Sequence, residues 1–530
     1  MSPCAKTAGL IFLAVSSGVV CAQNLNVTGV NLLREAVATN LDGTGVRVAQ
    51  IEATVSTNGD YFEVNPSAIG VAGVGFDYVS DLGAATNFPN GVGYESGHAD
   101  AVAGIFYGPG GVATHVAHVD NWFADEFVKI SGLPTPLLTN YTVTLPSTNL
   151  NDAVINQSFI YGDASVALQQ KSDSSYDNYA AQYQTLFVSG AGNGGPVQAP
   201  STCYNGLSVG VSDGSSSVGP TADNGRCKPD LVAPGGATSF STPLVAGAAA
   251  VLIQAARRGD GGADTNAAAD PRTIKALLLN GAVKPAGWTN LPPAPLDFRY
   301  GAGVLNVFNS YEQLLGRQQT NGAWTMTASP GGPHPPPDVT NSIAAWSAWD
   351  FNTNTSSLTA DGVNHYFFNL TNATDAPFLA AATLVWNRHA NQTAINNLNL
   401  FLYRCVDGHL MAASTSAVDN VEHIFLPRLA PGRYDLQVWK AGGSGMVSAA
   451  EPYALAWEFS SPTLAISRAG AGANLSWPAF PAGFVPEAAP DLTAPDWRTN
   501  GLPPPVFTNG QNVVFVGVTN AARFFRLRTQ

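Results

Sequence analysis

A serine stands at the start of an apolar helix in the segment Ala237–Gly247, where the sequence reads ATSFSTPLVAG. Pro243 suits the first turn of a helix, because the N–H groups there have no intrahelical partner, so we expect the helix to begin near Ser239. The run from Val245 to Ile253 has no polar face and must be buried on all sides. The hydroxyl of Ser239 would then lie at the positive end of a buried helix, where a nucleophile is well placed. A capping serine on a core helix is the simpler alternative.

Three upstream segments carry a histidine, an amide and an acid that could complete such a site. His98 begins another helix of small residues, in GHADAVAG. Asn193 follows an apolar run, in SGAGNGG, and taken alone it reads equally well as a turn residue with positive φ. Glu52 ends the apolar strand of GVRVAQIEA. A hydroxyl, a base and an acid together are the parts of a nucleophilic acyl-transfer site.

The order and local sequences of these segments resemble the subtilisin-like serine peptidases over roughly residues 28–316. The resemblance implies that Ser239 attacks the scissile carbonyl and that His98 takes its proton and later gives it to the leaving amine, with an acyl-enzyme intermediate. It also implies an oxyanion hole made of the side-chain amide of Asn193 and the backbone N–H of Ser239. The predicted function is therefore a serine endopeptidase with a Ser/His/Glu triad.

The acid departs from the family pattern, which carries aspartate where this chain carries Glu52, one methylene longer. A carboxylate is still available to accept the Nδ1–H of His98 and fix its tautomer. Sedolisins share the fold and use a glutamate, but they pair it with an aspartate and carry aspartate at the oxyanion position, so His98 and Asn193 favour the subtilisin-like assignment. Two alternatives stay open: Asp100 or Glu95 replaces Glu52, or the chain is a catalytically impaired binding or surface protein on the same fold.

Substrate contacts are expected on both sides of Ser239. The strand containing Asn156 and Gln157 resembles the family strand whose end pairs with extended substrate, and main-chain pairing would give broad specificity. Small residues opposite it leave room for a large apolar or aromatic side chain. The predicted substrate-binding residues are Ser158, Phe159 and Ile160 on the strand side and Gly190, Ala191 and Gly192 in the pocket. Phe159 is interpreted equally well as a core residue.

Metal and cofactor sites are not indicated by any motif. His115 and His118 are three residues apart in a stretch of alternating apolar residues, so they point to opposite faces and a joint metal site is not expected. No cluster of Asp, Asn and Gly matches a calcium loop. We therefore assign no metal ligand and no cofactor, while the family resemblance leaves a structural calcium ion open.

Charge and the first residues indicate the surroundings of the protein. The 530 residues carry a formal net charge of −13 with only 12% charged residues, which argues against nucleic acid as a partner. Residues 1–22 resemble a signal peptide, because Lys6 precedes an apolar stretch that ends in small residues. We expect a secreted, extracellular protein that acts on proteins or peptides and has no membrane anchor.

Five cysteines are present, and Cys4 and Cys21 fall in the expected signal peptide. Cys203 and Cys227 flank the approach to the serine motif and could form a disulfide in an oxidising compartment. Cys405 would then remain free and buried.

The predicted fold is α/β, a mostly parallel sheet flanked by helices, followed by C-terminal all-β domains. Strands are expected near residues 46–51, 114–119, 154–158, 186–189 and 207–211, and a helix over 270–282. The proposed acid and the cleft strand then sit at strand C-terminal ends, where open α/β sheets place ligands.

Domain boundaries follow from shifts in composition. The expected units are a signal peptide at 1–22, the peptidase domain at 23–316, a Pro/Gly-rich linker at 317–342, a β-sandwich at 343–460 and a small all-β module at 461–530. The β-sandwich loosely resembles the pre-peptidase C-terminal domain of secreted bacterial proteases. These β modules would contact a matrix or polysaccharide, or serve as stabilising spacers.

Overall fold

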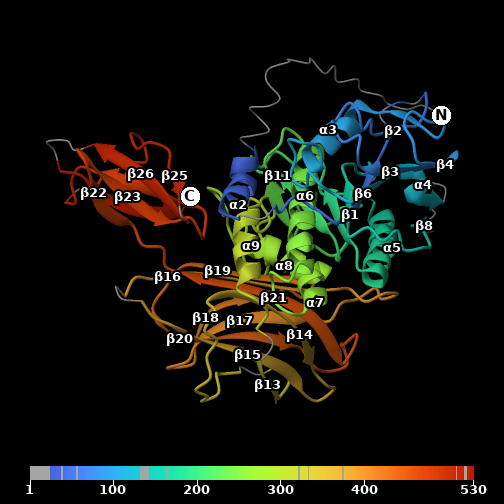
Figure 1. The fold of residues 1–530 in the computed structure, drawn as a ribbon. Helices are drawn as coiled ribbons and strands as arrows, with labels where there is room; N and C mark the ends of the chain where they lie inside the picture. The colour runs from blue at the N-terminus through green and yellow to red at the C-terminus, as the bar shows by residue number, and fades with distance from the viewer. Residues whose placement is uncertain are drawn as a thin grey trace.

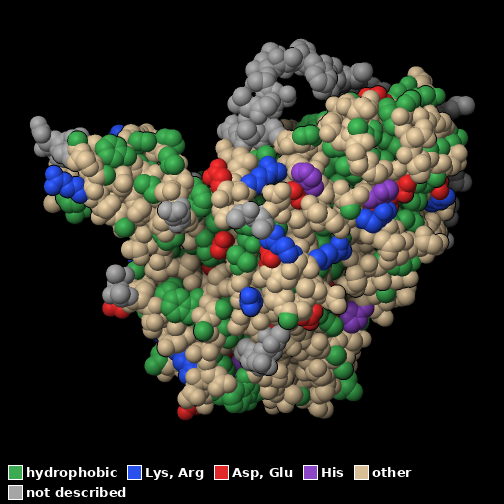
Figure 2. Space-filling model, viewed as in Figure 1, with side chains coloured by type: hydrophobic (Ala, Val, Ile, Leu, Met, Phe, Trp, Pro, Cys, Tyr) green, Lys and Arg blue, Asp and Glu red, His purple; other side chains and the backbone are tan. Residues whose placement is uncertain are grey.

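The computed structural model describes residues 24–37, 40–54, 56, 58–131, 142–162, 165–319, 323–331, 334–372, 375–493, 495–508, 510–517 and 522–529. The expected signal peptide, with Cys4 and Cys21, lies outside the described residues. A parallel α/β domain comes first, an antiparallel β-sandwich packs beneath it, and a smaller β module lies to one side (Figure 1). Charged side chains are scattered among uncharged polar and backbone atoms on the face in Figure 2, as the low charged fraction predicts.

Eight strands form the central sheet, in the order β12-β11-β10-β9-β1-β6-β3-β4. Their bounds are β1 (Arg47–Glu52), β3 (Gly75–Ser80), β4 (Gly83–Ala85), β6 (His118–Phe123), β9 (Val154–Gln157), β10 (Leu186–Gly190), β11 (Leu207–Val211) and β12 (Leu231–Ala233). Neighbouring strands are parallel except for β3 and β4. Strands β9, β10, β11 and β12 are buried along their whole length, because helices cover both faces. The prediction of a mostly parallel α/β fold is confirmed.

The helices are α2 (Val30–Ala36), α3 (Gly97–Phe106), α4 (Ala124–Phe127), α5 (Val166–Tyr183), α6 (Thr238–Arg257), α7 (Thr265–Ala269), α8 (Pro271–Asn280) and α9 (Val307–Leu315). Helix α6 begins one residue before Ser239, as predicted from Pro243 and the apolar run. It is long and apolar enough to cross a membrane, but 83% of its most apolar window is buried inside the protein. It is the central core helix, and α3, β9, β10 and β11 pack against it.

Two parts of this domain differ from the predictions. The strand expected at 114–119 begins only at His118, because the backbone N–H groups of His115 and Ala117 bond to Asp42 and Val46 in a turn. Helix α5 is not among the predicted elements, since its buried face includes polar residues such as Asp173 and gives no clear apolar stripe. Short strands β2 (Tyr61–Glu63), β5 (Tyr94–Glu95), β7 (Lys129–Ser131) and β8 (Thr142–Thr144) complete the domain.

The β-sandwich consists of two antiparallel sheets. The five-stranded sheet contains β13 (Ala323–Ala328), β15 (Asp361–Leu370), β20 (Gly432–Lys440), β17 (Leu398–Arg404) and β18 (His409–Ser414). The four-stranded sheet contains β14 (Ser347–Thr355), β21 (Ala450–Ser460), β16 (Phe378–Trp386) and β19 (Val421–Leu429). Strand β13 lies inside the range expected to be a linker and pairs with β15 from Ala323↔Tyr366 to Ala328↔Asp361, so part of that range belongs to the sandwich.

The last module is also antiparallel. It contains β22 (Ala465–Ala469), β23 (Gly472–Pro478), β24 (Phe484–Ala489), β25 (Val506–Thr508), β26 (Gln511–Gly517) and β27 (Phe524–Thr529). Its core is small and centres on Trp477, Leu475 and Val514. Antiparallel β-sheets therefore make up the C-terminal half of the fold, as the sequence indicates.

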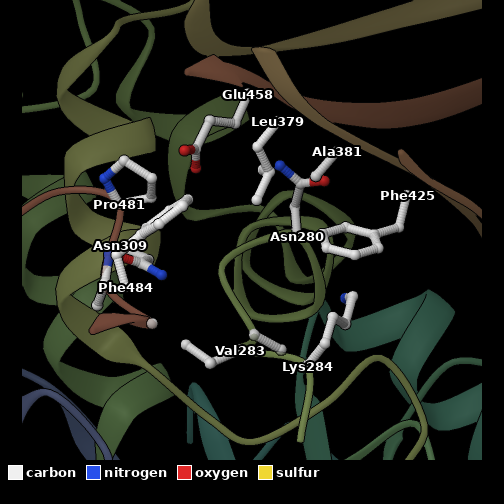
Figure 3. A pocket seen from close by; sticks show the side chains of 13 residues that line it. Asn280, Val283, Lys284, Asn309, Leu379, Ala381, Phe425, Glu458, Pro481 and Phe484 are labelled. Atoms are coloured by element: carbon white, nitrogen blue, oxygen red, sulfur yellow. The ribbon is translucent and has the colours of Figure 1, made fainter. Parts of the chain in front are cut away.

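The sandwich shares a core with the α/β domain. Val385, Val421, Ala454 and Ala456 of its four-stranded sheet belong to the apolar cluster of the α/β domain, and α8 packs on β16 and β21. A pocket lies where all three parts of the chain meet, with Lys284, Phe425, Glu458 and Phe484 among its lining residues (Figure 3). Burial lowers the pKa of Lys284 to about 7 and raises that of Glu458 to about 7.

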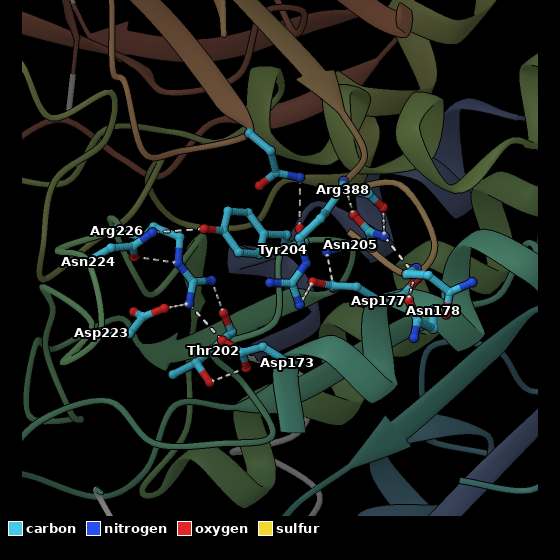
Figure 4. A network of polar contacts seen from close by, with 12 residues as sticks. Asp173, Asp177, Asn178, Thr202, Tyr204, Asn205, Asp223, Asn224, Arg226 and Arg388 are labelled. Carbon is cyan, nitrogen blue, oxygen red and sulfur yellow. Dashed lines mark hydrogen bonds and ion pairs between the residues drawn. The ribbon is translucent and has the colours of Figure 1, made fainter. Parts of the chain in front are cut away.

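Buried polar contacts reinforce this interface (Figure 4). Within the α/β domain, Arg226 pairs with Asp173 at 2.6 Å, and both side chains are only 1% exposed. From the sandwich, Arg388 pairs with Asp177 of α5 at 2.7 Å. Both guanidinium groups lie over the ring of Tyr204, at 3.9 Å and 4.7 Å from its centre. The network therefore joins α5, the loop carrying Tyr204 and the sandwich.

The disulfide expected between Cys203 and Cys227 is wrong, because both thiols are free and buried. They belong to two different apolar clusters, one that contains Phe187 and one that contains Leu296. Burial raises the pKa of the Cys203 thiol to about 12, so this thiol is not reactive at neutral pH. Cys405 is free and half-buried.

Replacement of Arg226 tests how far the fold depends on the polar network. We expect Arg226→Leu to lower the free energy of unfolding by about 3–5 kcal/mol, because it leaves Asp173 buried without its cation. Urea denaturation followed by tryptophan fluorescence measures the loss. The control is Arg404→Leu, whose pair with Asp407 is solvent-exposed and contributes little. An equal loss of unfolding free energy in the two variants would contradict the dependence of the fold on the pair of Arg226 with Asp173.

Candidate active site

The polar residues singled out from the sequence meet at the C-terminal edge of the central strands. Glu52 is the last residue of β1, and Ser158 and Asn193 follow β9 and β10. His98 lies in the first turn of α3 and Ser239 in the first turn of α6. Because parallel strands end at one edge of the sheet, β1, β9 and β10 bring their terminal residues together.

Glu52 and His98 form the shortest contact of the group. The Nδ1 atom of His98 lies 2.8 Å from Oε2 of Glu52, whose side chain is 1% exposed. This hydrogen bond raises the pKa of His98 above its ordinary value. With Nδ1 bound to the carboxylate, Nε2 is the ring nitrogen left for other chemistry. Asp100 instead accepts the backbone N–H of Asn65 at 2.8 Å, so the acid that bonds the imidazole is Glu52.

A second oxygen of Glu52 is held by residues that the sequence analysis missed. Gln50 donates from Nε2 to Oε1 of Glu52 at 2.8 Å and to the carbonyl oxygen of Ala99 at 2.9 Å. Tyr107 in turn donates its hydroxyl to Oε1 of Gln50 at 2.6 Å. These contacts form a buried chain from Tyr107 through Gln50 to Glu52 and His98. The signal was a polar residue in an apolar strand, two positions before Glu52 and therefore on the same face.

Ser239 is tied to the end of β9. Its hydroxyl donates to the carbonyl oxygen of Ser158 at 3.2 Å, and the hydroxyl of Ser158 donates to the carbonyl oxygen of Ser239 at 3.1 Å. The imidazole of His98 lies beside the start of α6, with its centre 6.2 Å from the ring of Phe240. The hydroxyl of Ser239 is thus bonded to Ser158 in this structure and not to His98.

Asn193 is exposed, and its amide has a defined orientation. Its Oδ1 accepts the backbone N–H of Thr238 at 2.8 Å and the Thr238 hydroxyl at 3.0 Å. Because a backbone N–H can only donate, the carbonyl of Asn193 faces α6 and its NH₂ group points away from Thr238. The preceding Gly192 has φ of +109°, and a Cβ there would lie 2.6 Å from Oγ of Ser217. Glycine is therefore required where the chain turns into Asn193.

The residues expected to bind substrate fall into two groups. Ser158, Phe159 and Ile160 continue beyond Gln157, the last residue of β9 that pairs with β1 and β10. Phe159 also packs against the apolar cluster around β10, so the core interpretation of its side chain holds in part.

On the opposite side, a Cβ built on Gly192 would lie 3.6 Å from Cδ1 of Ile160, so these two residues are near neighbours. Gly190 faces the hydroxyls of Thr238 and Thr242, with Oγ1 atoms 3.1 Å and 3.2 Å from a Cβ built there. Ala191 is fully buried, and its side chain is not available to a ligand.

Comparison with known proteins identifies the class. Residues 77–303 match the model of the subtilase family, so this chain contains a subtilase-family serine protease domain, which C-terminal β-sheet regions follow. The match includes His98, Asn193 and Ser239 but begins after Glu52. No curated protein matches the chain.

Among solved structures, the chain is similar to the prenylagaramide maturation protease PagA, with 19% identity, 55% of this chain and 99% of that chain covered, and a TM-score of 0.33. It is also similar to a serine protease of Aeromonas sobria, with 14% identity, 83% of this chain and 85% of that chain covered, and a TM-score of 0.34. Since both TM-scores are low, the assignment rests on the family match.

The contact between Glu52 and His98 predicts a titration shift. We expect Glu52→Gln to lower the pKa of His98, because the imidazolium loses its carboxylate while burial still disfavours its charge. NMR titration of the His98 ring measures this change. Asp100→Asn is the control, since it alters a nearby carboxyl that does not bond the imidazole. Equal pKa values in the Glu52→Gln variant and the wild type would refute the contact.

Proposed function

We propose that this chain is a secreted serine endopeptidase that cleaves peptide bonds through an acyl-enzyme, with Ser239 as nucleophile, His98 as general base, Glu52 as orienting acid and Asn193 as oxyanion donor. The observation that carries the proposal is the 2.8 Å bond from Glu52 to Nδ1 of His98, in a chain whose family match includes Ser239. The N-terminal segment supports secretion by its sequence alone, and a peptide extended along Ser158 to Ile160 is the proposed substrate.

The roles follow from what each group offers. Nε2 of His98 accepts the proton of Ser239 when the hydroxyl turns away from Ser158, and the resulting imidazolium is stabilised by Glu52. A bond then forms between Oγ of Ser239 and the carbon of the scissile carbonyl, and the carbonyl oxygen becomes negative. The NH₂ group of Asn193 and the N–H of Ser239, which lies in the first turn of α6 without an intrahelical acceptor, donate to that oxygen. His98 then gives the proton to the leaving amine as the C–N bond breaks and the acyl-enzyme forms. Water attacks the acyl-enzyme in the same way, with His98 again taking a proton, and the acid product is released from Ser239.

Covalent labelling tests the proposed nucleophile. We expect a fluorophosphonate probe to label the wild-type protein and not Ser239→Ala, with casein hydrolysis lost in parallel. Ser215→Ala removes an exposed serine elsewhere and serves as the control. If the folded wild type neither labels nor cleaves casein, the alternative of an impaired binding protein on this fold takes the place of the proposal.

Asn193 has a separate signature. Asn193→Ala should lower kcat by about 10²–10³-fold with a small effect on KM, because an oxyanion donor acts in the transition state. Peptide hydrolysis kinetics provide the measurement, and Asn58→Ala, a substitution of an exposed asparagine, is the control. A rise in KM without a fall in kcat would assign Asn193 to ground-state binding instead.

Gln50 and Tyr107 are positioning residues in this scheme, since they reach His98 only through Glu52. Gln50→Leu removes a hydrogen bond to a buried carboxylate and should reduce kcat by about tenfold or more while KM stays constant. Tyr107→Phe keeps the ring and should have a smaller effect of the same kind. Both variants should also shift the acidic limb of the pH–rate profile. A loss of thermal stability without these kinetic changes would make the two residues purely structural.

A further inference from the structure

A second cluster of titratable residues lies in the N-terminal halves of strands β3 and β6, whereas the candidate active site lies at the C-terminal ends of the central strands. Asp77 of β3 and Asp120 of β6 pair directly across neighbouring strands, and His118 lies two residues before Asp120 on the same face. Among the described residues, this is the one group of at least three His, Cys, Asp or Glu whose ligand atoms all lie within 4.8 Å of one another. His118 is in register with Arg47, and Asp120 with Ala49, so the cluster lies about 10–17 Å before Glu52 along the strand direction.

The geometry of His118 is unusual for an ordinary ion pair. Its Nε2 lies 3.1 Å from Oδ2 of Asp77 and 3.1 Å from Oδ1 of Asp120. Even so, this buried nitrogen makes no hydrogen bond of acceptable geometry within the described part of the chain. In a tetrahedral Zn²⁺ site with bonds of about 2.0–2.1 Å, neighbouring ligand atoms are about 3.3 Å apart. Both distances from Nε2 are close to this spacing, and the ligand oxygens of Asp77 and Asp120 lie within 4.8 Å of each other.

Asp152 provides an independent observation. It lies just before β9, is 2% exposed, and has no hydrogen-bond partner at either carboxyl oxygen among the described residues. Burial and the neighbouring carboxyl of Asp120 raise the pKa of Asp152 well above its ordinary value. A buried carboxyl beside a second acid is unfavourable as an anion unless a cation lies close to it.

The surroundings fit a divalent ion in charge and in shape. Arg47 contacts Asp120 at 3.1 Å, so a single guanidinium faces the carboxylates of both Asp77 and Asp120 and leaves one negative charge uncompensated. Gly75 lies beside His118 on the neighbouring strand, and a Cβ there would come within 2.8 Å of Nδ1. The glycine leaves room for the ring in the orientation that directs Nε2 at the two acids. The side chain of Asp77 is 44% exposed, which gives an ion access from solvent.

We propose that Asp77, His118 and Asp120 bind one divalent transition-metal ion of the Zn²⁺ or Mn²⁺ class, with the carboxyl of Asp152 next to it. An imidazole nitrogen among carboxylates favours these ions over Ca²⁺ or Mg²⁺, which prefer oxygen ligands alone. The ion joins β3 and β6, remote from Ser239. Its role is structural, so its loss lowers stability rather than the chemical rate.

Metal titration of the full-length, tag-free protein tests the site after removal of bound metal with a chelator. Equilibrium dialysis against Zn²⁺ should give one ion per chain, and Co²⁺ in its place should give the visible absorption of tetrahedral coordination. Zn²⁺ should also raise the thermal midpoint, because it binds only the folded state. Asp77→Asn and His118→Gln should each weaken Zn²⁺ binding by more than about tenfold.

The matched control is His115→Gln, because His115 pairs with a single carboxylate, Asp42 at 3.0 Å, and is exposed. It should bind Zn²⁺ like the wild type. The proposal is overturned if the wild type binds no stoichiometric Zn²⁺ at micromolar free metal, or if His118→Gln and His115→Gln bind it equally well. In either case the cluster is an internal polar network of Arg47, His118 and the acids. Circular dichroism of each variant tests whether the fold is retained. Asp77→Asn should disturb folding least, because the Asp77 side chain is 44% exposed.

Discussion

A buried carboxylate needs hydrogen-bond donors, and this requirement at Glu52 governs the arrangement of the candidate active site. Glu52 is 1% exposed at the end of β1. Its Oε1 accepts a hydrogen bond from the Gln50 amide, and its Oε2 bonds Nδ1 of His98. Gln50, two residues before Glu52 on the same strand face, donates to the carboxylate oxygen that does not bond His98. The tyrosine behind Gln50 fixes which end of the amide faces the acid. The orientation of the imidazole thus depends on four side chains rather than two.

The same edge of the sheet shows how a parallel fold gathers distant residues. Glu52, Ser158 and Asn193 follow three adjacent strands, while α6, buried on nearly every side, presents Ser239 from its first turn. Helix α8 is covered in turn by the four-stranded sheet of the sandwich, which continues the same apolar core. The buried pair of Arg388 with Asp177 also links the sandwich to α5 of the α/β domain. The sandwich therefore packs against the α/β domain and shares its apolar core, and the linker is not the only connection between them.

The sequence predicts the parts whose local pattern is strong. The apolar runs of β9, β10 and β11, the start of α6 at Thr238 and the helix expected over 270–282 all agree with the structure to within a few residues. Helix α5 is missed because its buried positions include Asp173 and Asp177, whose cationic partners Arg226 and Arg388 lie far away in the sequence. The disulfide between Cys203 and Cys227 is a wrong prediction because spacing along the chain does not show that the two thiols enter different cores.

The candidate site shows the same division. Ser239, His98 and Asn193 are found from short motifs, whereas the contacts of Gln50 and Tyr107 require the fold, because they are 57 residues apart. The cluster around His118 shows the same division. Along the chain the nearest histidine is His115, and the sequence indicates no joint metal site, whereas the partners Asp77 and Asp120 are brought to His118 by strand pairing.

One measurement tests the central claim directly: a crystal structure of the protein after reaction with a peptidyl phosphonate. The account predicts phosphorus bonded to Oγ of Ser239, the phosphonyl oxygen within hydrogen-bond distance of the Asn193 amide, and Nδ1 of His98 still bonded to Glu52. An adduct on another residue, or a Glu52 carboxylate turned away from His98 in that complex, would contradict it.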